Sequence, residues 1–595
     1  MTTVIEARFD DLTGREPSFR LVGPAGVLEA RRPDEVPGVL AAAEQAAARG
    51  LWAAGYVAYE AAPGLDPSLR VRSPGPDDPF GAAPLAWFAM FEGREETVLP
   101  EPPADQPMVP TAPWVASMTR PAYDAAIGRI RQHIAAGETY QVNFTQRLRA
   151  RVDGDPRGLY RDLCFAQRGA YAGYLDTGRF RVLSASPELF FRVDGRHIAA
   201  KPMKGTAPRG RWLDEDEEIK RRLQGSVKDR AENAMIVDLL RNDLGRVAQE
   251  GTVTWGDVFA PERFETVWQL TSGVAADLRQ GASLVDVFRA LFPCGSVTGA
   301  PKVSTMRIIA ALEQDARGVY CGTIGYLAPD GAPGPRARFN VAIRTVMYDA
   351  ETGDAAYGVG GGITWDSEAS AEYDETVAKA RVLTARRPPL RLLETLAHEP
   401  DDGYRRLDQH RSRLRSSAAY LGIEIDEAAI TTALDREAGR FPTKAARVRL
   451  LVDRHGRVEI GSAPLADTRE PVRLAIDRDH PVDATDPLLF HKTTLRERYD
   501  AARNRFPDAD DVVLVNTRGD VTETTRANIA LRRDDRWVTP PIDAGLLPGC
   551  ERAALLADGT LVEERITMRE LETAGELAFL NSVRGWKRAV LVDAT

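Results

Sequence analysis

Cysteine and histidine are scarce in this sequence, and their scarcity limits the chemistry it can support. The 595 residues include only four cysteines (Cys164, Cys294, Cys321 and Cys550) and seven histidines. No two cysteines form a Cys-x-x-Cys pair, so neither a disulfide framework nor a zinc site is indicated, and a reducing cytoplasm fits. A bound metal is therefore expected to be a hard cation held by oxygen ligands.

Long apolar runs and an excess of basic residues are also lacking. No run approaches the roughly 18 apolar residues of a transmembrane helix, and the first residues carry no basic and apolar leader. Lysine and arginine total 78 against 87 aspartate and glutamate, giving a formal net charge of −9. The sequence thus predicts no membrane span, no secretory signal and no general attraction for nucleic acid. An anionic ligand must be bound by local groups.

Composition and proline placement indicate folded domains. Hydrophobic residues make up 43% and charged residues 28% of the chain, which is typical of globular proteins. Proline-rich stretches occur at 99–113 and 385–390, and proline ends helices and favours linkers. The first stretch is expected to be a surface linker or an excursion between strands, and the second a domain boundary that separates a larger part from a smaller domain over 386–595.

The sequence contains both strand-like and helix-like hydrophobic patterns, but they do not follow one another as regularly as in a doubly wound fold. This predicts a mixed α/β structure of the α+β class. Helices are expected at Tyr123 to Ala136, Asp214 to Gly245, Lys302 to Gln314, Asp408 to Gly422 and Thr494 to Phe506.

Two pairs of acidic residues stand three positions apart in helical segments. They are Asp229 with Glu232 and Glu372 with Glu375. Each pair lies on one helix face, and two such faces can hold one Mg²⁺. The alternative is that both are solvated helix surfaces, which is the commoner situation for any single pair.

Glycine-rich segments offer backbone groups to an anion. Gly360, Gly361 and Gly362 follow a strand pattern in YGVGGGITW, and Ser296 lies in PCGSVTGAPK, which enters a helix at Pro301. Such segments let N–H groups approach a negative ligand, although many are plain turns. Arg344, within an apolar strand pattern, needs a partner that a substrate carboxylate can supply.

Lys204 is a candidate nucleophile in AAKPMKGTAPRG. If Lys201 and Arg209 crowd it in a desolvated site, its amine becomes reactive. An ordinary surface lysine is the alternative, and composition alone favours it.

Long motifs in the larger part occur in a family order. They are GETYQVNFTQRL, SASPELFFRV, KPMKGTAPRG, KDRAENAMIVDLLRNDLGRV, FPCGSVTGAPKVSTMRII, RGVYCGTIGYL, VAIRTV and GVGGGITWDSEASAEYDETVAKA. This part strongly resembles the chorismate-utilising enzymes, over most of residues 120 to 385. The resemblance implies an N-terminal part over 1–115 and a chorismate-utilising catalytic domain over 116–385. The resemblance implies a large, two-layered fold of antiparallel sheet, with chorismate as the substrate.

The lysine before Gly-Thr is typical of the aminodeoxychorismate synthase branch. The resemblance implies that Lys204 attacks chorismate at C2, that ammonia then enters at C4, and that Glu188 transfers a proton near the leaving hydroxyl. It implies Mg²⁺ ligation by Glu232 and Glu375, supported by Asp229 and Glu372. The implied substrate contacts are Arg344, Tyr320, Ser296, Lys379 and the amides of Gly360, Gly361 and Gly362.

The sequence departs from these relatives in two places. Gln269 stands where many relatives have a histidine, and Asp229 replaces a more usual glutamate. No cysteine lies in a glutaminase motif, so the resemblance implies a separate glutamine amidotransferase subunit as the source of ammonia.

The smaller part contains LLETL, HRSRL, HKTT, NTRGDVTETTRANI, GLLPGCER and FLNSVRG in that order. Each element alone is unspecific, but together they resemble class IV pyridoxal-phosphate enzymes, a fold of two subdomains. The resemblance implies that Lys492 holds pyridoxal 5'-phosphate covalently and that Glu523 contacts its ring nitrogen. Its phosphate is expected near Arg413, Thr525, Asn528, Gly549, Asn581 and Ser582.

About 20 to 30 residues that begin relatives of the second family have no counterpart before LRLLETL, and we expect packing on the first part to supply what they provide. The combined resemblances imply a bifunctional route from chorismate to 4-aminobenzoate, for folate or another aromatic product. Two alternatives remain: an anthranilate- or salicylate-type enzyme, and a second domain that is an inactive interaction module.

Overall fold

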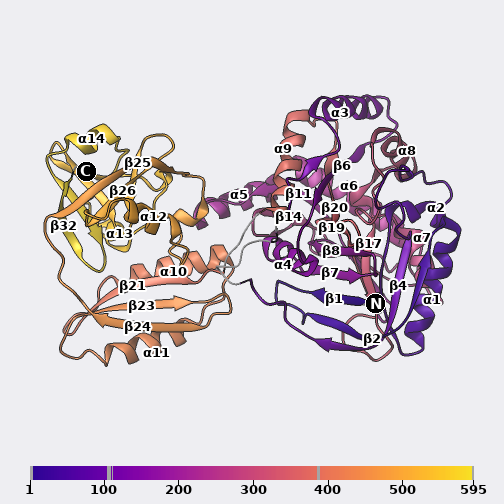
Figure 1. Cartoon of the computed structure of the whole chain (residues 1–595), viewed down its shortest axis with the longest axis horizontal. Helices are drawn as coiled ribbons and strands as arrows, with labels where there is room; N and C mark the ends of the chain where they lie inside the picture. The colour runs from indigo at the N-terminus through magenta and orange to yellow at the C-terminus, as the bar shows by residue number, and fades with distance from the viewer. Residues whose placement is uncertain (1–4, 103–108, 110, 385–388, 593–595) are drawn as a thin grey trace. The chain divides into compact units, whose positions relative to one another are not determined.

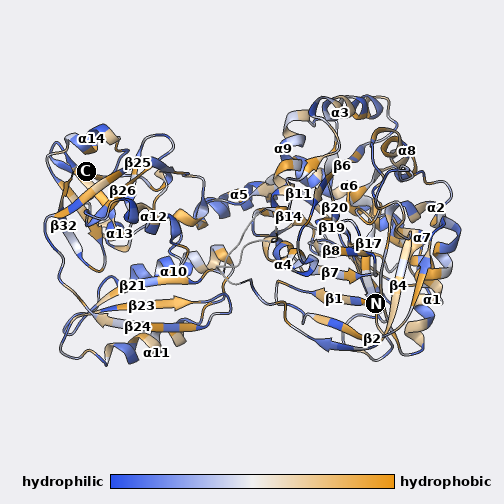
Figure 2. Ribbon diagram, in the orientation of Figure 1, coloured by the Kyte–Doolittle hydropathy of each residue, from blue (hydrophilic) through white to orange (hydrophobic). Residues whose placement is uncertain are grey.

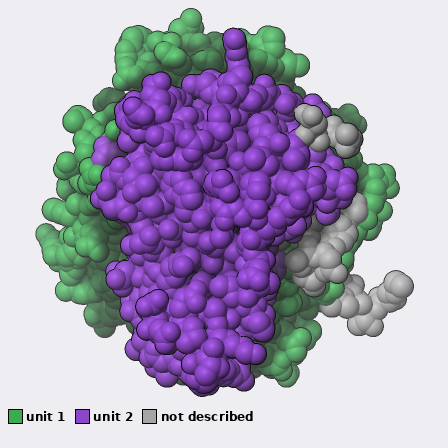
Figure 3. All heavy atoms as spheres, turned by 90° about the vertical axis from the view of Figure 1, so that its left-hand side faces the viewer, with its two compact units in different colours: residues 1–208, 220–387 green, residues 209–219, 388–595 purple. Residues whose placement is uncertain are grey.

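The computed structural model describes residues 5–102, 109, 111–384 and 389–592. The chain divides into two compact units, coloured separately in Figure 3. Unit 1 comprises Met1–Pro208 and Lys220–Arg387, and unit 2 comprises Arg209–Ile219 and Pro388–Thr595. Parts of both proline-rich stretches, at 103–108, 110 and 385–388, lie outside the described residues.

Unit 1 is built on a 17-stranded sheet whose neighbouring strands pair antiparallel. The pairings run β12-β15-β10-β9-β18-β17-β3-β4-β2-β1-β7-β8-β19-β20-β6, and both β5 and β16 pair with β6. The strands are β1 (Glu6–Asp10), β2 (Phe19–Ala30), β3 (Trp52–Val57), β4 (Ala86–Glu96), β5 (Val115–Ala116), β6 (Gln141–Arg151), β7 (Tyr171–Asp176), β8 (Phe180–Ser186), β9 (Leu189–Asp194), β10 (His197–Lys201), β12 (Thr254–Trp255), β15 (Val274–Asp277), β16 (Gly299–Ala300), β17 (Thr323–Leu327), β18 (Ala337–Val341), β19 (Thr345–Asp349) and β20 (Asp354–Ile363).

A small sheet and a set of helices complete unit 1. The small sheet has the order β11-β14-β13, with β11 (Met203–Pro208), β13 (Ala260–Arg263) and β14 (Val267–Thr271). The helices are α1 (Val36–Ala48), α2 (Ala62–Leu65), α3 (Arg120–Ala135), α4 (Pro156–Gln167), α6 (Val227–Gly245), α7 (Leu284–Leu291), α8 (Lys302–Leu312) and α9 (Ala369–Ala380). Helix α5 (Leu213–Gly225) begins in unit 2 and ends in unit 1.

Aromatic residues fill much of the core of unit 1. Phe191, Phe288 and Phe339 are fully buried, and their ring centroids lie 5.1 to 5.6 Å apart. Burial of large rings contributes most of the apolar stabilisation of such a core. At one end of the unit, α3 and α9 lie side by side, where Tyr123 and Tyr373 meet edge to face at 5.4 Å (Figure 1).

Two local expectations are wrong. The helix expected from Asp214 to Gly245 is interrupted, because Ser226 takes an extended conformation and its hydroxyl accepts the Asp229 N–H, which starts α6 as a new helix. Arg344 lies between β18 and β19 rather than inside a strand, with a φ of 53°. The expected helices near Tyr123, Lys302, Asp408 and Thr494 are present as α3, α8, α10 (Leu407–Leu421) and α12 (Glu497–Arg505).

Unit 2 contains two sheets. One is antiparallel with the order β22-β21-β23-β24, and the other is mixed with the order β27-β26-β25-β32-β31-β28-β29-β30. The strands are β21 (Leu392–Glu399), β22 (Gly403–Tyr404), β23 (Ala446–Val452), β24 (Val458–Pro464), β25 (Val472–Val482), β26 (Asp511–Asn516), β27 (Val521–Thr524), β28 (Asn528–Arg533), β29 (Arg536–Thr539), β30 (Leu561–Glu563), β31 (Leu577–Asn581) and β32 (Gly585–Leu591). The helices are α10 (Leu407–Leu421), α11 (Glu427–Ala438), α12 (Glu497–Arg505), α13 (Cys550–Ala557) and α14 (Met568–Thr573).

Each sheet of unit 2 has its own apolar core, one containing Leu414 and Val448 and the other Leu474 and Ile529. This agrees with two subdomains, and the predicted mixed α+β class is confirmed. Figure 2 shows β4 as predominantly hydrophobic and α5 as predominantly hydrophilic, as expected for a central strand and an exposed helix. No helix in the described part of the chain is long and apolar enough to cross a membrane.

Candidate functional site

One cavity in unit 1, of about 340 Å³, is lined by all of the candidate residues of the larger part. Its walls come from β11, α6, α9, the end of β20 and the segments before β9 and α8. The candidates brought together are Glu188, Lys204, Asp229, Glu232, Ser296, Tyr320, Arg344, Gly360, Gly361, Gly362, Glu372, Glu375 and Lys379, and Gln269 also lines the cavity.

Lys204 projects from β11 toward the glycines of β20. Its side chain is 16% exposed, and Nζ lies 3.5 Å from Oε2 of Glu232. A Cβ atom added to Gly362 would collide with this Nζ, so a larger residue at this position would displace the lysine amine. The expected cationic neighbours are engaged elsewhere, since Lys201 pairs with Glu262 and Arg209 with Asp216. Each of these two cations thus has a carboxylate partner, and the expectation that they crowd Lys204 stays a prediction.

The four candidate metal ligands come from two helices that face the cavity. Asp229 and Glu232 lie on α6, and Glu372 and Glu375 lie on α9. Burial raises the pKa of Glu372, and the carboxylate of Glu375 adds to this effect. Burial opposes ionisation of Glu375, but its pKa is lowered, because the Lys379 ammonium, 2.6 Å away, together with Lys204 and Arg344 outweighs that effect.

These carboxylates form a donor set suited to a hard divalent cation. Two of them, Glu232 and Glu375, are paired with lysines whose place a cation can take. Among the described residues, three potential ligand atoms approach within 4.8 Å of one another only at Glu394, His410 and Cys550, in unit 2. The chemistry of the cavity therefore fits Mg²⁺, although its ligands are not drawn together.

Glu188 is a buried carboxyl at the edge of the cavity. It is 3% exposed, and Ser296 Oγ donates a hydrogen bond of 2.7 Å to its Oε1. Burial raises the pKa of Glu188 to about 7, although Ser296 and the nearby Lys204 favour ionisation. A carboxyl with such a pKa holds a proton near neutral pH and can deliver it to a leaving group.

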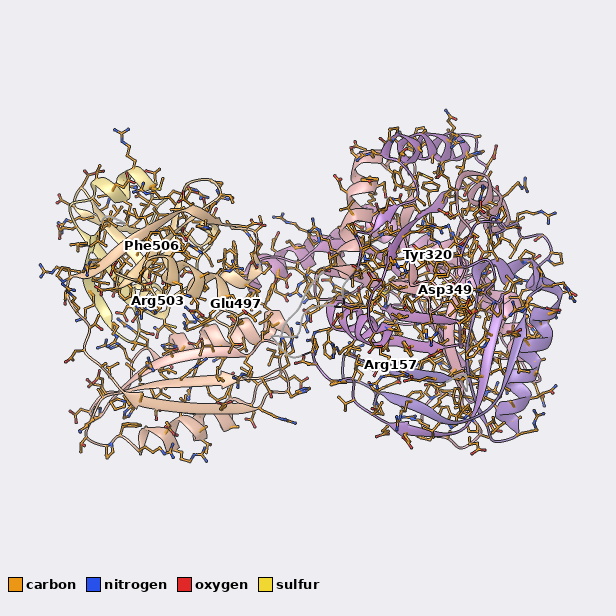
Figure 4. All side chains as sticks on the ribbon, viewed as in Figure 1. Arg157, Tyr320, Asp349, Glu497, Arg503 and Phe506 are labelled. Carbon is orange, nitrogen blue, oxygen red and sulfur yellow. The ribbon has the colours of Figure 1, made fainter. Side chains whose placement is uncertain are left out.

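Lys379 and Arg344 fix the end of β20. Lys379 Nζ donates to the carbonyl oxygen of Gly360 at 2.9 Å, and the Arg344 guanidinium donates to the carbonyl oxygen of Lys379. Burial lowers the pKa of Lys379. Tyr320, labelled in Figure 4, is buried with its ring against Gly358. Arg344 and Lys379 thus place positive charge beside the glycine amides.

Gln269 forms part of the cavity wall and contacts the neighbouring strand β11. Its Nε2 donates to Thr206 Oγ1 at 2.9 Å, and the two residues face each other across β11 and β14. An amide cannot exchange protons as a histidine does, so this position holds β11 in place without acting in proton transfer.

A second cavity lies in unit 2, with a volume of about 570 Å³. It is lined by every candidate residue of the smaller part: Arg413, Lys492, Glu523, Thr525, Asn528, Gly549, Asn581 and Ser582.

Lys492 lies in this cavity with its backbone held by β21. The Leu393 N–H donates to the Lys492 carbonyl oxygen at 2.9 Å. Burial lowers the pKa of Lys492 to about 8, and the cations Arg413 and Arg496 contribute. An amine with this pKa is partly neutral at physiological pH and can attack a carbonyl group.

Glu523 is buried next to a tyrosine. It is 4% exposed, and Tyr499 Oη donates to its Oε1 at 3.0 Å. Burial raises the pKa of Glu523 to about 8, although the hydrogen bond favours ionisation. A carboxyl of this kind can share a proton with a heterocyclic nitrogen.

Arg413 is held by a buried network that sequence reasoning missed. Its guanidinium contacts Glu394 at 2.5 Å, Glu394 contacts His410 Nδ1 at 2.6 Å, and His410 Nε2 lies 2.8 Å from Ser582 Oγ. The pKa of Glu394 lies at about 2: burial alone would raise it, but Arg413 and the hydrogen bond from His410 outweigh that effect. Glu394 and His410 lie in the motifs LLETL and HRSRL, which were the available signal.

The remaining candidates are positioned by short contacts. Helix α13 starts at Cys550 with Gly549 as its N-cap, as expected, and a Cβ at Gly549 would collide with Asn528. Thr525 donates to Asp511, and Asn581 Oδ1 accepts the Arg584 N–H at 2.7 Å. The helix start and Arg413 together form a site for a phosphate group.

Arginines dominate the rest of this cavity. Its lining contains eight arginines and one lysine against four acidic residues. Burial and the nearby guanidinium groups of Arg447 and Arg526 lower the pKa of Arg584. Such mutual repulsion is relieved by an anion, so the cavity favours a substrate that carries carboxylates. The alternation ARVRLL was a signal for Arg447 and Arg449, which lie on the same face of β23.

Comparison with known proteins assigns a family to each part. The model of chorismate binding enzymes matches residues 9–385, and that of amino-transferase class IV matches residues 391–591. Aminodeoxychorismate synthase of Streptomyces griseus is 43% identical over 343 residues, covering 55% of this chain and 46% of that protein. Anthranilate synthase component 1 of Aquifex aeolicus is 38% identical over 270 residues, covering 45% of this chain and 53% of that protein.

The chain therefore spans about half the length of these two curated relatives. Among solved structures, anthranilate synthase component I from Streptococcus pneumoniae superimposes with a TM-score of 0.51 at 24% identity. The superposition covers 65% of this chain and 91% of the Streptococcus pneumoniae chain, and it shows that the two folds are alike.

Proposed function

The chain belongs to the chorismate binding enzymes and carries a class IV amino-transferase domain, and we propose that it converts chorismate and ammonia into 4-aminobenzoate in two steps. The observation that carries the first step is the placement of Lys204, a partly buried amine directed at glycine backbone in a cavity lined by carboxylates. Relatives named aminodeoxychorismate synthase and anthranilate synthase both match this part, and Lys204 supports the first of these in our proposal.

In the first step, the Lys204 amine forms a bond to C2 of chorismate, the ring double bonds shift, and the C4–O bond breaks. Glu188, with a pKa of about 7, gives its proton to the departing hydroxyl, which leaves as water. Ammonia then bonds to C4 as the bond between C2 and Lys204 breaks. The product is 4-amino-4-deoxychorismate, and the excess proton of the ammonia returns to Glu188.

The substrate carboxylates are held by local positive groups. Arg344, Lys379 and the amides of Gly360 to Gly362 face the cavity. Glu232 and Glu375, with Asp229 and Glu372, would hold Mg²⁺, which supplies charge neutralisation and orientation for a carboxylate. In this way an acidic protein can bind an anion.

In the second step, pyridoxal phosphate supplies an electron sink when bound in unit 2. Lys492 would hold it, Glu523 would protonate the ring nitrogen, and Arg413 with the start of α13 would hold the phosphate. Lys492 takes the proton from C4 of the substrate, the bond from C3 to the enolpyruvyl oxygen breaks, and the ring becomes aromatic. The enolpyruvate takes up a proton and leaves as pyruvate, and the other product is 4-aminobenzoate.

The ammonia comes from a separate glutamine amidotransferase subunit in this proposal. All four cysteines are free and buried, and burial raises the pKa of each of their thiols. A buried thiol with a raised pKa is not a reactive nucleophile, so the chain is not suited to hydrolyse glutamine itself.

Product analysis tests the proposal. The full chain, freed of bound cofactor, is incubated with chorismate, Mg²⁺ and ammonium, with and without pyridoxal phosphate, and the products are separated by chromatography. We expect aminodeoxychorismate without the cofactor and 4-aminobenzoate with it. Formation of anthranilate contradicts the first step, and accumulation of aminodeoxychorismate under both conditions contradicts the second.

A further inference from the structure

A short segment of the chorismate-binding sequence belongs to the other unit. Residues Arg209–Ile219, called here the inserted segment, lie inside the range 9–385 matched by the chorismate binding family, yet they form part of unit 2. They begin five positions after Lys204, and the amino-transferase range 391–591 does not contain them. The family match to the amino-transferase domain therefore does not include this segment or its contacts within unit 2.

The inserted segment is closed by hydrogen bonds between its own residues. The buried carboxylate of Asp216 accepts hydrogen bonds from the Gly210 N–H and from Arg209 Nε, both at 2.8 Å. A Cβ atom at Gly210 would collide with the backbone of Asp216, so the turn is closed as tightly as glycine allows. Charge-assisted bonds of this kind in a buried setting fix the loop in one conformation.

This loop docks on α10 through Tyr420. Tyr420 Oη donates to the Gly210 carbonyl oxygen at 2.7 Å, and Arg209 Nη2 donates to the Tyr420 carbonyl oxygen at 2.8 Å. The Arg209 guanidinium also lies 4.4 Å from the centre of the Tyr420 ring. Two reciprocal hydrogen bonds and a cation–π contact thus join the segment to unit 2.

The same loop contacts the two residues that precede Lys492. His491 Nε2 donates to the Arg211 carbonyl oxygen at 3.2 Å, while its Nδ1 accepts from Ser417 Oγ at 3.0 Å. The His491 ring stacks on Tyr420 at 4.2 Å, and the Trp212 ring lies 5.1 Å from that of Phe490. Both Phe490 and His491 are buried.

His491 is suited to a fixed structural position. Burial lowers its pKa to about 4, so the ring stays neutral near pH 7, with one nitrogen donating and the other accepting. Lys492 itself is held from its other side by the hydrogen bond from β21 to its carbonyl oxygen. The backbone that carries Lys492 is therefore clamped between β21 and the inserted segment.

We propose that the inserted segment completes the cofactor site of unit 2, and that Trp212 and His491 are positioning residues that hold Lys492 in place for pyridoxal phosphate. This inference rests on the proposed function of unit 2.

The test uses the full chain and the replacement Trp212→Ala. Trp212 does not line the chorismate cavity, so formation of aminodeoxychorismate reports correct folding in the same sample. We expect the pyridoxal phosphate concentration that gives half-maximal visible absorbance to rise about tenfold. Hydrogen exchange of the backbone over 488–494, measured without cofactor, should become faster.

Two further variants make the result specific. Trp212→Phe keeps a ring against Phe490 and should restore both readouts, whereas Trp255→Ala removes an exposed tryptophan of unit 1 and should change neither. His491→Ala should reproduce the effect of Trp212→Ala, which keeps the inference testable if Trp212→Ala does not fold.

The outcomes separate the inference from the proposed function. A wild-type chain that shows no visible absorbance with pyridoxal phosphate overturns both. A wild-type chain that binds the cofactor, with Trp212→Ala and His491→Ala unchanged in titration and exchange, overturns the inference alone.

Discussion

Lys204 Nζ lies 3.5 Å from Oε2 of Glu232, so the candidate nucleophile and a candidate metal ligand form one ion pair. A cation held by Glu232 would compete with the Lys204 ammonium group for this carboxylate. In the proposed mechanism, metal binding and the placement of the nucleophile would be coupled through this pair.

Replacement of Lys204 by alanine tests covalent catalysis. We expect Lys204→Ala to lower the rate of aminodeoxychorismate formation from chorismate and ammonium at least about 100-fold, because the nucleophile is removed. Lys201→Ala is the matched control, since Lys201 lies on β10 and pairs with Glu262. Unchanged product formation by Lys204→Ala would show that ammonia attacks without a lysine adduct.

The pH dependence of the first step should follow Glu188. Its pKa is raised to about 7, so the proton-donating form is present below that pH and is lost above it. We expect the rate with saturating chorismate and ammonia to fall as pH rises through about 7, once corrected for the ammonia fraction. Glu188→Gln should be slow and should lack this limb; a limb that persists in Glu188→Gln assigns it to another group.

Lys492→Ala should abolish the visible absorbance that pyridoxal phosphate develops on the protein, because no other amine is placed to bind it covalently in this proposal. The control is Lys587→Ala, which removes a lysine of β32 that pairs with Glu470. Aminodeoxychorismate formation should be unaffected in both variants. Retained absorbance in Lys492→Ala would place the covalent attachment elsewhere.

The pair of Glu394 and Arg413 should stabilise unit 2 in a pH-dependent way. The pKa of Glu394 is lowered from 4.5 to about 2, so its stabilisation is complete above about pH 4.5 and is lost as pH falls toward 2. Glu394→Gln leaves the Arg413 guanidinium buried without its charge partner, which costs about 3–5 kcal/mol. Denaturant unfolding at pH 7 measures this loss.

The control for Glu394 is Glu459→Gln, which breaks an exposed ion pair with Arg391. We expect this change to alter the free energy of unfolding by less than about 1 kcal/mol. Equal effects of the two variants would mean that the buried network contributes nothing beyond a surface pair.

The arginine-rich cavity predicts a preference for substrates with two carboxylates. Arg584→Ala should raise the KM for aminodeoxychorismate about tenfold with a smaller change in kcat, since it weakens binding of a carboxylate in substrate and transition state alike. Cofactor absorbance should remain. A KM equal to that of the wild type would remove Arg584 from substrate recognition.

The sequence predicted residues of both cavities because they lie in long motifs. Glu188, Lys204 and Glu375 are widely separated along the chain, yet each stands in a segment that matches the family order, and the structure brings all three to one cavity. The fold class was also predictable, because strand-like and helix-like hydrophobic periodicities both occur in the sequence. The roles of these residues stay predictions.

Contacts between distant segments were not predictable. Arg209 meets Tyr420, 211 positions away, and nothing in either local sequence points to the other. The break at Ser226 had a local signal in Gly225-Ser226, but the helical period on both sides outweighed it. Arg344 has a φ of 53° between two strands, and apolar periodicity does not reveal such a backbone conformation.

The inserted segment belongs to unit 2 but lies in the sequence between two stretches of unit 1. This affects how the two units can be separated or exchanged. The chain leaves unit 1 after Pro208, returns at Lys220 and leaves again after Arg387, so excision of unit 2 requires breaks at three places. A fragment beginning at 386 lacks the segment, and one ending at 385 keeps it without its partners. Exchange of either unit with that of a relative must therefore keep residues 209–219 matched to the surface around Tyr420 and Phe490.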